Sequence, residues 1–158
     1  MIPIISIICL INILKMKVKI RRFDKSLPMP VYKTPGSVAV DLYSRVDVEI
    51  PAGEIFYIPM NIAIEIPQGY FVLLAARSSV HKMGIQPING VGIFDRDFCG
   101  DNDEYHFIVR NFTNDTVKIE KGTRLCQLLL MKYDIFEFEE VNEMGNPSRG
   151  GIGSTGTK

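Results

Sequence analysis

The stretch "VDVEIPAG" (residues 46–53) contains the pattern that decides the fold. Apolar and acidic residues alternate as far as Ile50, and Pro51, Ala52 and Gly53 then form a turn signal. Because successive side chains of a strand point to opposite faces, this combination predicts a half-buried β-strand that ends in a turn. The same alternation recurs in "KVKIR" (17–21), "NIAIEI" (61–66), "EYHFIV" (104–109), "TVKI" (116–119) and "FEFE" (136–139).

Further turn signals lie between these runs. They occupy residues 34–36, 67–69, 113–115 and 120–122. No stretch of a dozen residues has a convincing 3.6-residue period, although residues 78–84 could hold one helical turn. Many short strands separated by turns are typical of an antiparallel sandwich or jelly roll. We therefore predict an all-β protein.

The chain has 158 residues, which favours a single domain with a substantial core. Lysine plus arginine and aspartate plus glutamate both number 18, so the net charge favours neither nucleic acid nor an anionic membrane as a partner. From about Glu139 the chain becomes acidic and then rich in glycine, proline and serine. We expect a β domain over residues 16–140 and a flexible arm over 141–158.

The amino-terminal run "MIPIISIICLINIL" is almost entirely apolar. It is shorter than the roughly 20 residues that a membrane span needs. Its basic residues follow it, which is the reverse of the order in a signal peptide. We expect residues 1–15 to be a leader, with translation normally beginning at Met16. A segment packed on the body is the second interpretation and a membrane anchor the third.

The three cysteines, Cys9, Cys99 and Cys126, are scattered and form no CxxC pair. Such a set predicts reduced thiols in a cytoplasmic protein and argues against a disulfide framework or a zinc site. His81 and His106 are far apart in the sequence, which argues against a histidine-based metal site.

The tail "GGIGSTGTK" (150–158) contains the glycine spacing of a dinucleotide-binding fingerprint. That fingerprint needs a following helix and an acidic residue about 20 positions later, but only Thr157 and Lys158 remain. A Rossmann site is therefore excluded, and the residues around Lys158 do not fit a phosphate-binding Walker loop. Backbone amides with the hydroxyls of Ser154 and Thr155 could still close over a phosphate.

Four other groups could carry chemistry. Asp95 and Asp97 would share one face of a strand, but a solvated hairpin with both in the turn is the favoured interpretation of that segment alone. Residues 101–104, "DNDE", are more typical of a polar turn than of a cation site. Arg77, after an apolar run, is either a surface charge or a phosphate fork. Gln127 in a buried strand needs a partner, either in the core or on a ligand.

Five segments, read in order, resemble the five motifs of the trimeric dUTPase family (deoxyuridine 5′-triphosphate nucleotidohydrolases). They are "SVAVDLYS", "ARSSVHKMG", "NGVGIFDRDFCGD", "GTRLCQL" and "RGGIGSTG". The resemblance extends from about Lys17 to Thr157, and its specificity lies in the order of motifs that are weak individually. It implies a jelly roll or distorted β-barrel that forms a homotrimer, with active sites at subunit interfaces and a carboxyl-terminal arm exchanged between subunits.

The implied reaction is the magnesium-assisted hydrolysis of dUTP to dUMP and pyrophosphate. This reaction keeps uracil out of DNA and supplies dUMP for thymidylate synthesis. The resemblance makes Asp95 the general base for the water that attacks the α-phosphorus. It places Asn89 and Gly92 at the uracil, within a hairpin over 89–98, and Phe98 under the deoxyribose, where the family usually has tyrosine.

On the phosphate side, the resemblance assigns Arg77, Ser78 and Ser79 to the triphosphate and Gln127 to the α-phosphate and the attacking water. Asp41 would order water around a magnesium ion that is held mainly by phosphate oxygens. The arm residues implied to close over the bound nucleotide are Arg149, Ile152, Gly153, Ser154 and Thr155.

Several positions depart from the family pattern. The second motif is usually Pro-Arg-Ser-Gly but here is Ala76-Arg77-Ser78-Ser79, and the second serine resembles the related dCTP deaminases. Ile152 replaces a phenylalanine that stacks on uracil, so we expect weaker ordering of the arm. Arg149 directly precedes the glycines, and "CGDNDE" extends the third motif. A dCTP deaminase, a bifunctional deaminase–dUTPase and a catalytically idle regulatory trimer are the alternatives. Asp95 and the glycine tail favour the dUTPase, because a deaminase should have a catalytic glutamate near the third motif and lack this tail.

Overall fold

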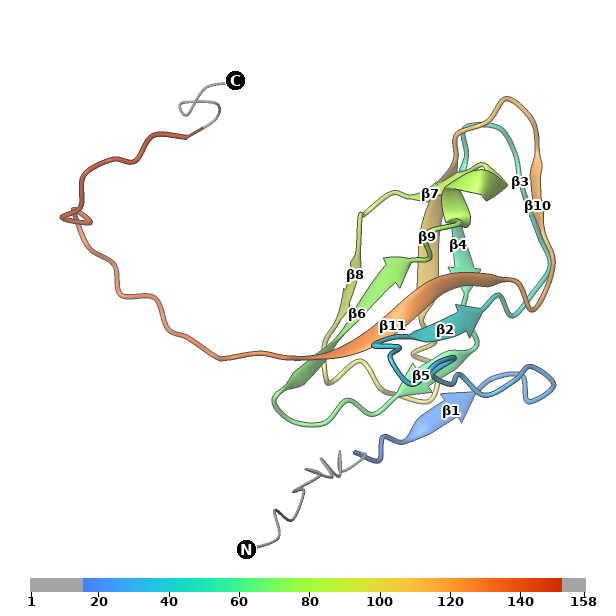
Figure 1. Ribbon diagram of the computed structural model, residues 1–158, viewed down its shortest axis with the longest axis horizontal. Coiled ribbons are helices and arrows are strands. Elements are labelled where there is room, and N and C mark those ends of the chain that lie inside the picture. Colours follow the sequence, from blue (N-terminus) through green and yellow to red (C-terminus); the bar gives the residue numbers. More distant parts are fainter. Residues whose placement is uncertain (1–15, 152–158) are drawn as a thin grey trace, which may run out of the picture.

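A computed structural model describes residues 16–151 of the chain. The expected leader and four of the expected arm residues (Ile152, Gly153, Ser154 and Thr155) lie outside the described residues. The described part is all-β apart from one turn of 3₁₀ helix, which confirms the predicted fold class (Figure 1). None of its helices is long and apolar enough to cross a membrane.

Eleven short strands and the 3₁₀ helix follow one another along residues 16–151. Their bounds are β1 Ile20–Arg22, β2 Val40–Tyr43, β3 Val48–Ile50, β4 Ile55–Pro59, β5 Ile62–Ile64, β6 Tyr70–Ala76, η1 Val80–Met83, β7 Ile85–Pro87, β8 Gly92–Phe94, β9 His106–Asn111, β10 Val117–Ile119 and β11 Arg124–Lys132. The helix falls within the expected helical turn at 78–84.

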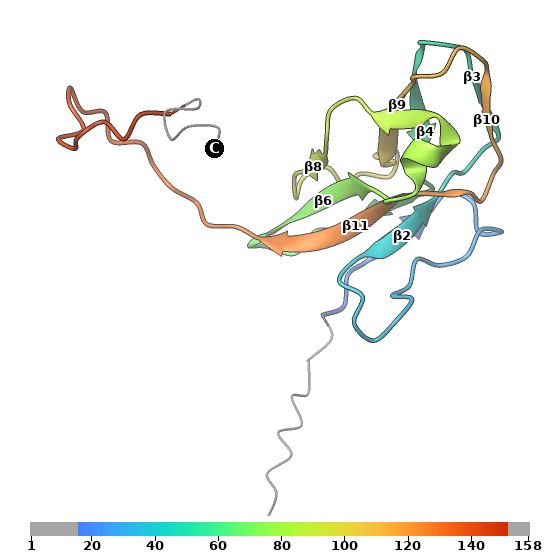
Figure 2. The same ribbon diagram turned by 45° about the horizontal axis from the view of Figure 1, so that its top comes forward.

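All strand pairs formed within the described residues are antiparallel. A four-stranded sheet has the order β2-β11-β6-β8, a three-stranded sheet has the order β4-β9-β7, and β1-β5 and β3-β10 form two further pairs. The two larger sheets lie over each other (Figure 2), with fully buried side chains such as Val72 of β6 and Val109 of β9 in one shared cluster. Burial of such a side chain stabilises the fold by about 1.5–3 kcal/mol. The core therefore lies between the two sheets.

Two expected local structures are not formed. Residues 136–139 alternate in sequence but make no strand within the described chain, and Phe136 and Phe138 are 72% and 92% exposed. A strand needs a neighbour for its backbone groups, and this segment runs away from the sheets (Figure 1). Residues 89–98 are not a paired hairpin, because β7 pairs with β9 and β8 pairs with β6.

The outward face of the four-stranded sheet has a polar end and an apolar middle. In register, Asp41 of β2 lies opposite Gln127 of β11, which lies opposite Ala75 of β6. Two residues further along β11, Leu129 lies opposite Leu73 of β6, which lies opposite Ile93 of β8. We call Leu129, Leu73 and Ile93 the apolar row; Ile93 is 65% exposed.

Candidate active site

Asp41 is held by two arginines at one end of this sheet face. Its Oδ1 lies 3.1 Å from Nε of Arg77, and its Oδ2 accepts a hydrogen bond of 2.9 Å from Nη1 of Arg124. The Asp41 side chain is only 15% exposed, so the carboxylate is tightly surrounded within this chain. We call Asp41, Arg77, Arg124 and Gln127 the arginine cluster.

Arg124 is the member of the arginine cluster to which the motif resemblance gave no role. In a regular strand, residues 124 and 127 point to opposite faces. The pairing of β11 with β2 shifts register between Arg124 and Cys126, which is a β-bulge at Leu125. Such a bulge re-aims the side chains beside it, and here Arg124 reaches Asp41 on the outward face.

Backbone carbonyls fix the other two members. Arg77 donates from its amide to the carbonyl of Leu125 at 3.0 Å and from Nη1 to the carbonyl of Arg124 at 3.2 Å. Gln127 Nε2 donates to the carbonyl of Ala76 at 3.1 Å. The partner that Gln127 needed is thus a backbone group, which holds the amide of its side chain in one orientation at the outward face.

Ser78 and Ser79 connect the arginine cluster to the 3₁₀ helix. Ser78 is exposed, and Ser79 is the residue before the helix, with no capping bond from its hydroxyl. Among the described residues, neither backbone amide has an acceptor. Two amides and two hydroxyls are therefore available to an anion beside Arg77.

Asp95 lies at the opposite end of the sheet, directly after β8. Residues 95–98 form a turn in which the Phe98 amide donates to the Asp95 carbonyl at 3.2 Å. Asp95 and Asp97 are both exposed and both lie beyond the strand, so the expected solvated turn is confirmed, but this turn does not close a hairpin, because β8 pairs with β6. The Phe98 ring, 39% exposed, lies 5.9 Å from the Phe94 ring and 6.1 Å from the Tyr105 ring between centroids.

Asn89 and Gly92 lie on the segment that passes from the three-stranded to the four-stranded sheet. Asn89 is exposed, and its carbonyl accepts from the Val91 amide at 2.9 Å. A Cβ at Gly92 would stand 3.0 Å from the Phe94 ring and 3.3 Å from Leu74. Glycine therefore lets this segment approach its neighbours closely while the Asn89 side chain stays exposed.

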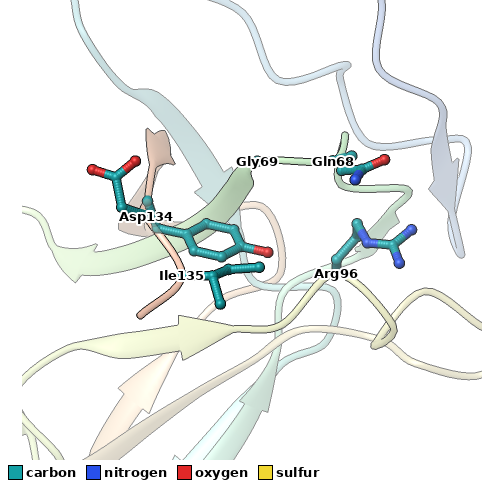
Figure 3. A pocket seen from close by; sticks show the side chains of 6 residues that line it. Gln68, Gly69, Arg96, Asp134 and Ile135 are labelled. Carbon is teal, nitrogen blue, oxygen red and sulfur yellow. The ribbon is translucent and has the colours of Figure 1, made fainter. Parts of the chain in front are cut away.

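Two hollows lie beside the turn after β8, one lined by Asp95 and both lined by Arg96. The first, of about 280 Å³, is lined by Tyr70, Phe71, Ile93, Asp95, Arg96 and Tyr133. The second, of about 390 Å³, is lined by Gln68, Gly69, Arg96, Tyr133, Asp134 and Ile135. In the second, Gln68 and Arg96 lie on one side and Asp134 on the other (Figure 3). Both hollows lie where the chain leaves β11.

The arginine cluster and Asp95 do not meet within one chain. Phe94 pairs with Val72, so Asp95 lies beside Phe71 at the start of β6, whereas Arg77 follows the end of that strand. At about 3.3 Å per residue, the stretch from Phe71 to Arg77 spans about 20 Å. A single nucleotide phosphate cannot touch both groups of one chain.

Arg149 is exposed on the segment that leaves the body after β11. Close to it, the Gly150 amide donates a hydrogen bond of 3.4 Å to the Ser148 hydroxyl. The colours of Figures 1 and 2 show this segment extending well beyond the sheets. Within one chain, the described part of the arm does not reach the arginine cluster or Asp95.

No group of three or more histidine, cysteine or carboxylate side chains within residues 16–151 could hold a metal ion. Each Asp41 oxygen accepts from one arginine and keeps further lone pairs, because an ionised carboxylate has about four acceptor positions. These spare positions of the Asp41 carboxylate fit a contact, through water, to a magnesium ion that is itself bound by a triphosphate. They do not fit an ion bound by protein ligands alone.

The two described cysteines are free and differ in environment. Cys126 lies under the arginine cluster, where burial raises the pKa of its thiol well above the usual value and the Asp41 charge raises it further. Cys99 is exposed in the loop that follows Asp95.

Comparison with known proteins identifies the family to which the chain belongs. The family model described as dUTPase matches residues 25–157. The deoxyuridine 5′-triphosphate nucleotidohydrolase of Dictyoglomus turgidum is 42% identical over 147 residues, which cover 89% of this chain and 98% of that protein.

Two solved structures show the same fold. A mutant dUTPase of Staphylococcus bacteriophage 80alpha with dUpNHpp has a TM-score of 0.77 at 21% identity and covers 90% of this chain and 99% of that one. A mutant dUTPase from phage phi11 of S. aureus, described with a structural Mg(II) ion, has a TM-score of 0.72 at 20% identity and covers 82% and 99%. Since the family model spans most of the chain and a closely similar relative spans nearly its own full length, the chain belongs to the dUTPase family.

Proposed function

We propose that the chain hydrolyses dUTP to dUMP and pyrophosphate at a site that neighbouring copies build together, with Asp95 from one copy and the arginine cluster from the next. The family and the name of its relative identify the reaction. The observation that carries the shared site is the separation, by about 20 Å, of Asp95 from Arg77 along one sheet.

The apolar row supports a contact between copies. It occupies the middle of the outward sheet face, between the arginine cluster and Asp95. Burial of an apolar surface of this kind against another protein surface lowers the free energy of the assembly. In a heterologous contact a neighbour covers the row with a different surface of its own, so its Asp95 end could lie at this chain's arginine cluster, and such contacts close into a ring. A homotrimer closes such a ring.

The residues of this site divide the chemistry. Asp95 accepts a proton from the water that attacks the α-phosphorus, and general base catalysis of this kind contributes about 10²–10⁴-fold to a rate. Gln127, held by the Ala76 carbonyl, orients that water and the α-phosphate. Arg77, held by Asp41, presents its remaining N–H groups to the phosphates. The amides of Ser78 and Ser79 add neutral donors.

The segment at residues 89–98, which includes Asp95, would recognise the uracil base. Asn89 and the main chain up to Phe98 would hold the uracil, and their fixed backbone would exclude a 5-methyl or a 4-amino group. Phe98 would lie under the deoxyribose and exclude a 2′-hydroxyl. The arm, with Arg149, Ile152, Gly153, Ser154 and Thr155, would close over the bound nucleotide from a further copy.

Magnesium would be bound by phosphate oxygens and by water that Asp41 holds, and it would supply charge neutralisation for the leaving pyrophosphate. The dUTPase of phage phi11 that shares this fold is described with a structural Mg(II) ion. The spare acceptor positions of Asp41 are the feature of this chain that supports the role.

Incubation of the purified protein with dUTP, dCTP and dTTP in the presence of magnesium tests the proposal. We expect pyrophosphate from dUTP alone. Ammonia from dCTP would instead indicate a deaminase or a bifunctional enzyme, and no product from any nucleotide would indicate a regulatory trimer. Either result would overturn the proposed function.

A further inference from the structure

The extension that follows the third motif ends in a buried charge. Glu104 is the last residue of "DNDE", and its side chain is only 6% exposed. Its Oε1 accepts from Nε of Arg45 at 2.8 Å and its Oε2 from Nη2 at 2.9 Å, which makes a two-pronged ion pair. Oε1 also accepts from the Asn61 amide at 2.8 Å. The expectation of a merely polar turn is therefore wrong for Glu104.

The partners of Glu104 are themselves fixed. The Arg45 amide donates to the Pro59 carbonyl at 2.9 Å. Asn61 has a left-handed backbone, with φ of 70°, and its side chain accepts from the Asp24 amide at 2.6 Å and donates to the Asp24 carbonyl at 3.0 Å. Because a buried carboxylate is stable only with such partners, the network fixes the end of the extension against two other loops.

This anchor continues to Asp95 through an aromatic stack. The backbone of Tyr105, next to Glu104, donates to the Ile62 carbonyl and accepts from the Met60 amide, both at 2.8 Å. Its ring lies 4.0 Å from the Phe94 ring and 6.1 Å from the Phe98 ring. Phe94 directly precedes the turn at residues 95–98, and Phe98 is the last residue of this turn. The residues between them, which include Asp95, are exposed.

We propose that Glu104 is a positioning residue. Its ion pair with Arg45 anchors the end of the extension, and the stacked ring of the neighbouring Tyr105 thereby holds the turn that presents Asp95 to the nucleotide. The proposal rests on the proposed function. It gives the extension a role in catalysis. A loop that projects the general base toward another copy needs an anchor in its own chain, and Glu104 is the buried charge that supplies it.

The same loop contains a matched control. Asp101 forms an ion pair of 2.9 Å with Arg21, but the two side chains are 93% and 48% exposed. Exposed pairs of this kind contribute little, because water and salt screen them. Asp101→Asn and Glu104→Gln therefore each remove one charge from the same extension. Asp101→Asn leaves the buried Glu104 network intact, whereas Glu104→Gln alters it.

Steady-state hydrolysis of dUTP by the two variants tests the proposal, with active sites counted by titration with dUpNHpp and the temperature kept well below both melting points. For Glu104→Gln we expect kcat per titrated site to fall by roughly tenfold or more with KM little changed, because small displacements of a catalytic group are costly. Hydrogen exchange of residues 95–100 should also rise. Asp101→Asn should match the wild type in both measurements.

A lower melting point for Glu104→Gln with unchanged kcat per site and unchanged exchange would show a purely structural role and overturn the proposal. If Glu104→Gln does not fold, Arg45→Lys keeps the charge but loses the two-pronged geometry, and the same two readouts decide. If the wild-type protein releases no pyrophosphate from dUTP, the proposed function fails, whereas the exchange measurement still tests the anchor.

Discussion

The two ends of the four-stranded sheet are built in opposite ways. At the end formed by the arginine cluster, Asp41 is mostly buried and held by two arginines, and Gln127 is tied to a backbone carbonyl. At the other end, Asp95 is exposed in a turn that follows the last residue of β8. This contrast fits the proposed function, in which one chain would preorganise the phosphate-binding half of the site and a neighbour would bury the exposed Asp95.

The largest effect should come from the exposed end. We expect Asp95→Asn to lower pyrophosphate release from dUTP by about 10²–10⁴-fold, since the amide cannot accept the proton of the attacking water. Binding of dUpNHpp should persist, because the arginine cluster is untouched. Asp97→Asn, in the same turn, is the control and should stay within a few-fold of the wild type. Near-normal turnover by Asp95→Asn would remove Asp95 from the role of base.

Removal of the arm tests whether the two ends need a third contribution. A chain that stops after Met144 lacks Arg149 and the glycine-rich tail, yet keeps every strand that residues 16–151 form. Each charge-assisted hydrogen bond that the arm makes is worth about 1.5–3 kcal/mol, so we expect activity to fall by roughly 100-fold with an unchanged melting point. Normal kinetics of the truncated chain would show that the arm is not a lid.

A smaller effect should follow at the arginine cluster. Arg124→Ala leaves Asp41 with Arg77 alone, so we expect a loss of about 1 kcal/mol in the free energy of unfolding, because the pair is partly exposed. The KM for dUTP should rise several-fold, since Arg77 is less firmly placed. Lys118→Ala removes an exposed pair with Glu49 and should change neither quantity. Equal effects of the two substitutions would contradict a special role for Arg124.

The thiols report the same contrast without any change in activity. Cys126 is fully buried with a raised pKa, whereas Cys99 is exposed near Asp95. With iodoacetamide near neutral pH, followed by peptide mass spectrometry, we expect the native protein to be modified at Cys99 and not at Cys126. Both should react in denaturant. Rapid native modification of Cys126 would mean that the sheet beneath Asp41 opens easily.

The sequence predicted the parts of the fold that depend on local periodicity. The alternation in "VDVEI" and "TVKI" predicts β3 and β10, and the turn signal at residues 51–53 leads into β4. β4 itself escaped prediction because Ile55, Phe56 and Tyr57 are all apolar and show no alternation. "FEFE" alternates but has no partner strand among the described residues, since pairing depends on what lies alongside and not on the segment itself.

The candidate site shows the same limit. The resemblance of the motifs selected Asp41, Arg77 and Gln127, which do come together. It could not select Arg124, because its direction depends on a bulge formed between two strands. It could not show the burial of Glu104 either, since Arg45 is distant in the sequence and "DNDE" has the composition of a surface turn.

A mixing experiment with two inactive chains tests the shared site most directly. The Asp95→Asn chain keeps its arginine cluster, and the Arg77→Ala chain keeps Asp95, so neither variant alone should form a complete site. If neighbours supply the two halves, refolding the chains together in equal amounts should restore about a quarter of the wild-type dUTP hydrolysis, because about one interface in four then joins two intact halves. If the mixture is no more active than the sum of the separate variants, one chain supplies both halves and the account is wrong.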